Sequence, residues 1–311
     1  MKAVRIHQYG GVSSLQFEDA PMPICASNEI IIKVIGSSVN PVDWKIRQGQ
    51  LQAMIKYEMP FIPGWDVAGI VHYTGALAAR FKVGDAVYSR PDIARNGSYA
   101  EFIVVRESEV ALKPKTISFI EAAVLPLAGI TAFEALITVG EIAPGQRVLI
   151  HAAAGGVGSL AVQIAKAKGA YVIATGSRKN QDLIESLGAD EFFDYKTQSL
   201  KDSVKNINLV FDTMGGKTQQ ESWQVMTPNG MLVSIAEDPE EDVKQWPNLR
   251  GAFLFIKPNA TVLKQLAQMV DEGLVRPVIG SEFSLKDIQQ AHTLSETGHA
   301  LGKIALYVGQ P

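Results

Sequence analysis

Three closely spaced glycines are the residues of this chain best suited to holding a phosphate-containing ligand. Gly155, Gly156 and Gly158 follow the apolar run Arg147 to Ala152 and open the segment Val157 to Lys168, where apolar residues recur at helical spacing. The run is too short for a helix, so it predicts a buried parallel strand. Glycine lets the backbone turn tightly and approach a pyrophosphate, and a helix N-terminus offers unpaired N–H groups and a positive dipole end.

A second apolar run, Tyr171 to Thr175, completes a strand–helix–strand unit around these glycines. Glycines at this spacing also occur in strand-to-helix connections that bind no nucleotide, and that is the alternative interpretation. The surrounding unit is the context that a dinucleotide-binding turn requires. The sequence therefore predicts a dinucleotide site at this turn.

The residues after the second run indicate the phosphate state of the nucleotide. An NAD site places an acidic residue about 20 residues beyond the glycines, where it binds the ribose 2′-hydroxyl. Here stand Ser177, Arg178 and Lys179. One charged hydrogen bond to a 2′-phosphate is worth roughly 1.5–3 kcal/mol, or about tenfold or more in affinity. The sequence predicts NADPH, the alternative being that Arg178 and Lys179 form a solvated turn.

Composition and charge narrow the class of protein. The chain has 311 residues, 47% of them hydrophobic and 20% charged, with a net charge of −3. This length predicts two domains, and this charge offers no broad attraction to nucleic acid or to an anionic membrane. No apolar run approaches the roughly 18 residues of a membrane-spanning helix, and the N-terminus alternates like a strand. We expect a cytoplasmic protein with no nucleic-acid or membrane partner.

Cysteine and histidine are too sparse for a metal site. Cys25 is the single cysteine, which excludes an internal disulfide and a zinc site built from several thiolates. The five histidines are scattered without the close spacing of a metal-binding pair. We predict no metal site.

The pattern of elements changes along the chain. Residues 1–117 read as short strands separated by turn residues, which predicts a small β domain. From a capping box at Ser118-Phe-Ile-Glu121, helical spacing runs to Leu136, and strands and helices then alternate. Six strand candidates predict one parallel sheet, with its ligand at the carboxyl ends of the strands. We assign residues 118–258 to this nucleotide-binding domain, and residues 259–311 to a return to the β domain.

The chain resembles the medium-chain dehydrogenase/reductase superfamily, in its zinc-independent quinone oxidoreductase branch. The likeness covers nearly the whole sequence, and seven stretches in order carry it: Ser37-Ser-Val-Asn-Pro-Val-Asp43, Ile62-Pro-Gly-Trp-Asp-Val-Ala-Gly-Ile-Val71, Gly84-Asp-Ala-Val-Tyr88, Gly97-Ser-Tyr-Ala-Glu101, Leu125-Pro-Leu-Ala-Gly-Ile-Thr-Ala132, Ala153-Ala-Gly-Gly-Val-Gly158 and Gly298-His-Ala-Leu-Gly-Lys303. The implied fold is α/β, a GroES-like β domain plus a Rossmann domain with a doubly wound parallel sheet. In zinc enzymes of this superfamily, ligands fall where this chain has Asn40 and Gly64-Trp65-Asp66.

The resemblance implies a set of site residues. Catalytic residues at the nicotinamide end would be Asn40 and Asp43. Cofactor-binding residues would be Asn40, Thr131, Ala154, Gly155, Gly156, Val157, Ser177, Arg178, Tyr195, Phe253, Phe255 and Lys303. The resemblance also implies a homodimer formed through the nucleotide domain.

Structural roles are alternatives for several of these residues. Asn40 before Pro41 could only shape a turn, and Asp43 could cap the short helix Trp44 to Arg47. Tyr195 could cover the edge of the sheet. Phe253 and Phe255 alternate as in a strand, which favours core packing for one of them.

The lack of metal ligands points to a reaction that needs none. Alcohol oxidation requires an alkoxide to be stabilised, usually by a metal, whereas a quinone or an α,β-unsaturated carbonyl accepts hydride without one. We therefore expect an NADPH-dependent reductase of quinones or enones, with the proton from water or from Tyr57, although a packing role for Tyr57 is the stronger alternative. Other function classes are an NADPH-binding sensor or scaffold with little turnover, and an RNA-binding protein, which the acidic balance opposes.

Overall fold

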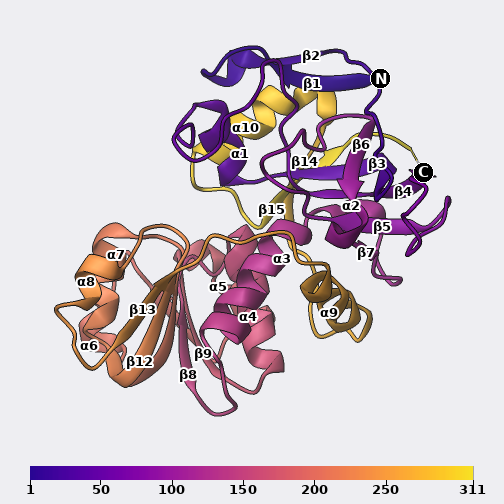
Figure 1. The fold of residues 1–311 in the computed structure, drawn as a ribbon. Helices are drawn as coiled ribbons and strands as arrows, with labels where there is room; N and C mark the ends of the chain where they lie inside the picture. The colour runs from indigo at the N-terminus through magenta and orange to yellow at the C-terminus, as the bar shows by residue number, and fades with distance from the viewer. Residues whose placement is uncertain (311) are drawn as a thin grey trace. The chain divides into compact units, whose positions relative to one another are not determined.

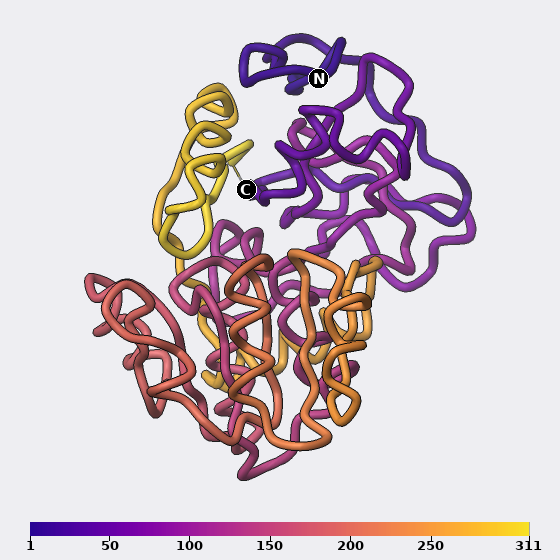
Figure 2. The backbone as a smooth tube through the Cα atoms, turned by 90° about the vertical axis from the view of Figure 1, so that its left-hand side faces the viewer, coloured from indigo at the N-terminus to yellow at the C-terminus, as the bar shows by residue number. Residues whose placement is uncertain are grey.

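The computed structural model describes residues 1–310 and divides the chain into two compact units (Figure 1). Unit 1 comprises Met1–Leu127, Lys257–Glu272 and the chain from Pro277 onward, and unit 2 comprises Ala128–Ile256 and Gly273–Arg276. Within unit 1, the yellow C-terminal segment lies beside the indigo and violet N-terminal segments in both views (Figure 2). Lys303, near the C-terminus, thereby lies next to Asn40.

Unit 1 is built on β-strands. Seven of them form one sheet in the order β14-β15-β3-β4-β5-β7, with β6 paired to β3, and β1 and β2 form a separate pair. The strands are β1 (Lys2–Ile6), β2 (Leu15–Asp19), β3 (Glu29–Val39), β4 (Val67–Thr74), β5 (Ala86–Ser89), β6 (Phe102–Arg106), β7 (Val110–Leu112), β14 (Ile279–Ser284) and β15 (Lys303–Tyr307).

The core of this sheet follows from the alternation of residues along β3. Ile30, Ile32 and Val34 point to one side, where they pack on residues of β4 to β7 such as Val71 and Val105. The helices of unit 1 are α1 (Pro41–Arg47), α2 (Phe119–Ala123), α9 (Ala260–Asp271) and α10 (Ile288–Glu296), with short turns η1 (Val12–Ser14), η2 (Glu107–Glu109) and η5 (Leu285–Asp287). A second core cluster joins β1, α1 and α10 through Ile6, Ile46 and Ile288.

Unit 2 contains the predicted parallel sheet. Its six strands lie in the order β10-β9-β8-β11-β12-β13, and every pair is parallel. The strands are β8 (Arg147–Ile150), β9 (Tyr171–Gly176), β10 (Glu191–Asp194), β11 (Ile207–Asp212), β12 (Met226–Ser234) and β13 (Arg250–Phe253). This is the strand order of a doubly wound nucleotide-binding fold. β9 and β10 lie on one side of β8, whereas β11, β12 and β13 lie on its other side, so the switch point is between β8 and β11. The predicted fold class is confirmed.

Helices precede and connect these strands. They are α3 (Pro126–Phe133), which begins in the last residues of unit 1, α4 (Gly156–Ala167), α5 (Gln181–Ser186), α6 (Leu200–Ser203), α7 (Gly216–Trp223) and α8 (Glu240–Val243), with a π-helical segment η3 (Glu134–Val139) and a short turn η4 (Arg178–Asn180). The apolar residues of α4 that recur at helical spacing, such as Leu160 and Ile164, are buried.

The segment 118–136 differs from the single helix that its spacing predicts. It forms α2, a break at Val124 and Leu125, then α3, which starts at Pro126. Proline fits the first turn of a helix and disrupts its interior, so Pro126 starts a new helix. Residues 118–127, which the sequence pattern places in the second domain, cluster with unit 1, where Ala123 and Ile120 lie against Gly36 of β3.

Candidate functional site

The glycine turn lies at the carboxyl end of β8, where the fold predicts a ligand. The N–H of His151, one residue beyond β8, donates to the Phe211 carbonyl of β11 at 3.2 Å, so the turn begins at the switch point between these two strands. Gly155 caps α4 at its N-terminus, and Gly156 and Val157 form the first turn of that helix. Ala154 is buried at 6% exposure, and its three successors are partly exposed.

Two glycines of this turn have different surroundings. A Cβ on Gly158 would lie 2.3 Å from the Ala152 carbonyl oxygen, so packing of α4 on the turn demands glycine there. Gly155 has φ −81° and ψ 175°, an extended conformation open to any residue. A Cβ on Gly155 would meet the Ala152 oxygen at 3.2 Å and nothing else within 4 Å. The free space beside Gly155, together with the helix N-terminus, fits a pyrophosphate.

The predicted 2′-phosphate residues lie at the end of β9, the neighbour of β8. Ser177 precedes η4, and the Arg178 and Lys179 side chains are exposed. Neither cation forms an ion pair with any described residue. Tyr195 follows β10 and is 56% exposed, with the Lys196 ammonium 6.0 Å from its ring centre. Three cationic side chains therefore follow adjacent strand ends, an arrangement suited to a phosphate group.

A buried ion pair forms the centre of the site in unit 1. The Lys303 ammonium lies 3.2 Å from the Asp66 carboxylate, with side-chain exposures of 5% and 0%. Lys303 also donates to the Oδ1 atom of Asn40, and the Asn40 amide donates to Asp66 at 2.8 Å. Strand register explains the meeting, because β15 pairs with β3 through Ile304 and Val39, which brings Lys303 beside Asn40.

Asp43 lies in the same network, one step further from Lys303. Its Oδ2 accepts the Asn40 N–H at 2.7 Å and the Tyr99 hydroxyl at 2.8 Å. Asp43 thus caps α1, the structural role that the sequence left open, although the helix begins at Pro41 and not at Trp44. Its Oδ1 is buried with no hydrogen-bond partner among the described residues. Burial raises the pKa of Asp43 to about 7, against the opposing effect of its two donors.

The network continues from Tyr99 to the end of α10. The Tyr99 hydroxyl lies 3.3 Å from Nε2 of His292, and Nδ1 of His292 lies 3.2 Å from the Arg47 guanidinium. Because Arg47 can only donate, Nδ1 accepts and the proton of the neutral ring is on Nε2. Burial lowers the pKa of His292 to about 3, with the Arg47 charge acting in the same direction. Arg47 also pairs with Glu296.

Tyr57 occupies a packing environment. Its ring stacks on Phe61 with centroids 4.1 Å apart, and its hydroxyl donates to the Ile93 carbonyl at 2.5 Å. Burial raises its pKa. Donation of the Tyr57 proton to a substrate would require this bond to the Ile93 carbonyl to break first.

The remaining predicted residues lie in unit 2. Thr131 is buried on α3. Phe253 ends β13 and Phe255 lies beyond that strand, with exposures of 43% and 41%. Phe255 lies outside the strand in which the two rings were expected to alternate, and neither ring has the core position that alternation favoured for one of them.

Asp66 is the functional candidate that the sequence analysis did not place among the site residues. It is fully buried and accepts from Ser38 at 2.5 Å, from Asn40 at 2.8 Å and from the Leu127 N–H at 2.6 Å. A carboxylate at the start of a strand, inside an otherwise apolar stretch, was the available signal.

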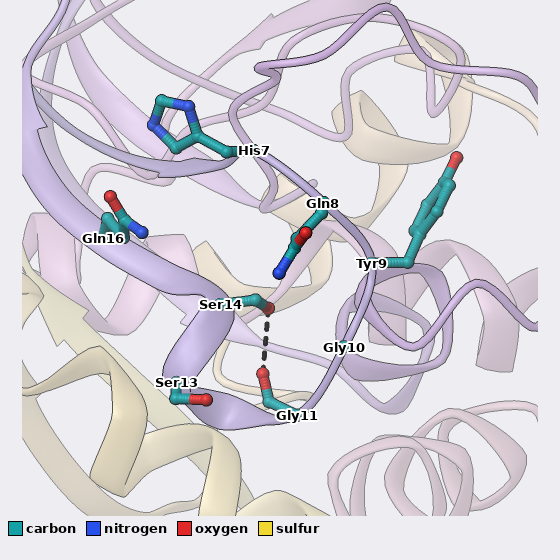
Figure 3. A pocket seen from close by; sticks show the side chains of 8 residues that line it. All are labelled: His7, Gln8, Tyr9, Gly10, Gly11, Ser13, Ser14 and Gln16. Carbon is teal, nitrogen blue, oxygen red and sulfur yellow. Dashed lines mark hydrogen bonds between the residues drawn. The ribbon is translucent and has the colours of Figure 1, made fainter.

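A separate polar hollow of about 420 Å³ lies at the end of β1 (Figure 3). His7, Gln8, Tyr9 and Gln16 line it together with the loop that holds Gly10, and none of the predicted site residues does. The Gly10 carbonyl accepts from Arg47 at 3.1 Å, which fixes this loop to the buried network.

The two units together define a nicotinamide-dependent oxidoreductase of two domains. Residues 26–115 match the alcohol dehydrogenase GroES-like domain, and residues 187–306 match the zinc-binding dehydrogenase domain. The chain is 36% identical to the NADPH-dependent alkenal/one oxidoreductase of Arabidopsis thaliana, over 99% of this chain and 79% of that protein. It is 35% identical to the chloroplast envelope quinone oxidoreductase homolog of the same plant, over 98% and 97%.

Solved structures agree with this assignment. The quinone oxidoreductase from Coxiella burnetii superposes with a TM-score of 0.92 at 32% identity, covering 99% of both chains. The quinone oxidoreductase of Escherichia coli complexed with NADPH gives 0.90 at 26% identity, covering 99% and 100%. The chain belongs to the quinone oxidoreductases of the medium-chain dehydrogenase/reductase superfamily, and it is an enzyme of this type.

Residues 1–310 hold neither a candidate metal site nor a candidate membrane-spanning helix. No cluster of three histidine, cysteine or acidic side chains there is arranged to hold a metal ion. Nor does any helix in that range have the length and apolar character needed to cross a membrane.

Proposed function

We propose that this enzyme uses NADPH to reduce quinones or α,β-unsaturated carbonyl compounds without zinc. The observation that carries the proposal is the end of β9, where Ser177, Arg178 and Lys179 stand in place of an acidic residue. An acidic side chain there would select the free 2′-hydroxyl of NAD, whereas donors and positive charge select a 2′-phosphate. A relative and a structural neighbour named for NADPH support the same cofactor.

The residues in unit 1 support a reaction that needs no metal. Where zinc enzymes of the superfamily bind metal, this chain offers an amide at Asn40 and an ion pair between Asp66 and Lys303. NADPH, when bound, supplies a hydride. Asn40 would position the nicotinamide and the substrate oxygen, Asp43 would hold Asn40 through its backbone N–H, and the proton would come from water or from Tyr57. Because charge spreads onto a conjugated oxygen, hydrogen-bond donors suffice.

The substrate class separates two candidate functions. Relatives named as an alkenal/one oxidoreductase and as a quinone oxidoreductase homolog support both acceptors. A sensor or scaffold that binds NADPH with little turnover would share the site in unit 2 and leave the site in unit 1 unused. A homodimer and a cytoplasmic location belong to the proposal as well, and the edge strand β13, paired on one side only, offers a surface for such a dimer.

The first test is a fluorescence titration of NADPH and of NADH on the wild type and on Arg178→Ala. We expect NADPH to bind at least about tenfold more tightly, with the preference falling by a similar factor in the variant. Lys201→Ala, at an exposed lysine of α6, is the matched control and keeps the preference. Addition of 9,10-phenanthrenequinone or an enone then tests turnover, and NADPH binding without consumption would favour the sensor.

A further inference from the structure

We propose that the Lys303 ammonium stabilises the negative charge that develops on the substrate oxygen, and that Asp66 is the residue that positions it. The inference rests on the proposed function and adds to it a catalytic role for Lys303 and a positioning role for Asp66. Three buried polar side chains, those of Lys303, Asn40 and Asp66, contact one another at the ends of three adjacent strands.

Strand register produces this meeting. β15 lies beside β3 and β3 beside β4, and the pairs Ile304 with Val39 and Ser37 with Val67 fix their registers. Lys303 begins β15, Asn40 follows β3 and Asp66 precedes β4, so all three residues lie at the same end of three neighbouring strands. A position held by three strands is more rigid than one on a loop, which is what catalysis requires of a charged group.

One N–H of the Lys303 ammonium has no hydrogen-bond acceptor among the described residues. Of its three N–H donors, one goes to Asn40 Oδ1 and one to Asp66, and no described residue accepts the third. Asp66 is fully enclosed, whereas Lys303 keeps 5% exposure. A substrate oxygen would therefore meet the cation and not the carboxylate.

Asp66 does not need Lys303 for its hydrogen bonds. Its Oδ2 accepts from Ser38 at 2.5 Å and from Asn40 at 2.8 Å, and its Oδ1 accepts from the Leu127 N–H at 2.6 Å. A buried ion pair adds little to stability, because desolvation of both ions offsets their attraction. The arrangement is better explained by a need for a cation held at a fixed place.

Reduction of an enone shows where the charge would develop. A hydride from NADPH would form a C–H bond at the β-carbon. The electron pair of the C=C bond would move toward the carbonyl, and the carbonyl oxygen would become an enolate oxygen. Lys303 donates its third N–H to that oxygen and stays protonated. Water then protonates the α-carbon, the carbonyl re-forms, and the hydroxide that remains is neutralised by the buffer. The cofactor is oxidised by two electrons and the substrate reduced by two.

The test compares Lys303→Met with the double variant Lys303→Met/Asp66→Asn. The single variant leaves the Asp66 charge buried and unpaired, so its melting temperature should fall. The double variant removes both charges and should recover most of that loss. If Lys303 is catalytic, kcat/KM stays roughly 10²–10³-fold below wild type in both variants. Lys264→Met, at an exposed lysine of α9 in the same unit, is the control and keeps full activity.

A second readout needs no turnover. p-Nitrophenol resembles an enolate in its oxygen, and its anion absorbs visible light, so a pH titration reports its pKa when bound. We expect wild-type protein to lower that pKa by about one unit or more and the double variant to leave it unchanged.

Distinct outcomes overturn the two proposals. Recovery of both stability and kcat/KM in the double variant would show that Lys303 only neutralises Asp66, and an unshifted p-nitrophenol pKa in the wild type would overturn the inference as well. A wild type that consumes no NADPH with any quinone or enone would instead refute the proposed function, and the p-nitrophenol titration would still test anion binding at Lys303.

Discussion

Two buried carboxylates in one hydrogen-bonded network have different surroundings. Asp66 accepts hydrogen bonds at both oxygens and faces the Lys303 cation, whereas Asp43 has Oδ1 without a partner. Tyr99, Asn40, Asp66 and Lys303 are the polar groups around Asp43, and burial outweighs the donors among them. The protonation of Asp43 should therefore change within the neutral pH range.

This difference predicts how Asp43→Asn changes the pH dependence of stability. The pKa of Asp43 is about 7 in the folded protein, against about 3.9 unfolded. Between these values the folded state holds a proton that the unfolded state has lost, so the Asp43 contribution to stability falls as pH rises. The wild type should lose roughly 2–3 kcal/mol from this group between pH 5 and 8. The variant should lack that loss.

Urea unfolding at several pH values measures the difference between wild type and variant. The quantity to follow is the free energy of unfolding of the variant minus that of the wild type, which should rise with pH. A difference that stays constant would mean that Asp43 is ionised at pH 5. Asp85→Asn, at a half-buried position just before β5 of the same unit, is the control for loss of a carboxylate elsewhere in the unit.

The turn between β8 and α4 holds one glycine that packing requires, Gly158, and one that packing does not require, Gly155. Gly158→Ala places a Cβ 2.3 Å from a backbone oxygen that cannot move aside, so the variant should unfold at a lower temperature. Gly155→Ala meets one oxygen at 3.2 Å in an ordinary backbone conformation, so it should keep most of its stability. It should nevertheless bind NADPH at least about tenfold more weakly, because the methyl group fills the space for the pyrophosphate.

Thermal unfolding and NADPH titration of the two variants check this prediction together. Tight NADPH binding by Gly155→Ala would place the pyrophosphate elsewhere. Equal loss of stability in both variants would mean that the whole turn serves packing.

Sequence patterns predict this second domain better than the site in the first. The unit from β8 to β9 is local, and its strands and helix lie within one or two residues of the predicted bounds because hydrophobic period and glycines act over short distances. Asn40, Asp66 and Lys303 meet only through strand pairing between distant parts of the chain. No local pattern marks Asp66 as a partner of Lys303, and none marks the break before Pro126, because apolar spacing continues across it.

The whole molecule carries one buried neutral histidine in each unit. His292 of α10 in unit 1 lies beside Arg47 and Tyr99. His151 in unit 2 lies 2.8 Å from Ser222 and 3.2 Å from Thr175, with Asp212 and Glu221 nearby. Burial lowers the pKa of His292 to about 3 and that of His151 to about 4. Both units should therefore weaken on acidification over the same pH range.

This shared property predicts the response of the enzyme to acid. A histidine in the unfolded chain has a pKa near 6.5. Below that pH the unfolded state binds a proton at each of these histidines, whereas the folded state does not. The free energy of unfolding therefore falls as the pH drops toward about 4. Between pH 6.5 and 5, each histidine should lower the free energy of unfolding by roughly 2 kcal/mol, whereas Asp43 should raise it over the same range.

His292→Asn keeps an acceptor for Arg47 and should resist acid better than the wild type. His151→Asn should do the same for unit 2. Hydrogen exchange at pH 5 distinguishes the units, because each variant should slow exchange in its own unit only; a change in both would show that the two units unfold together.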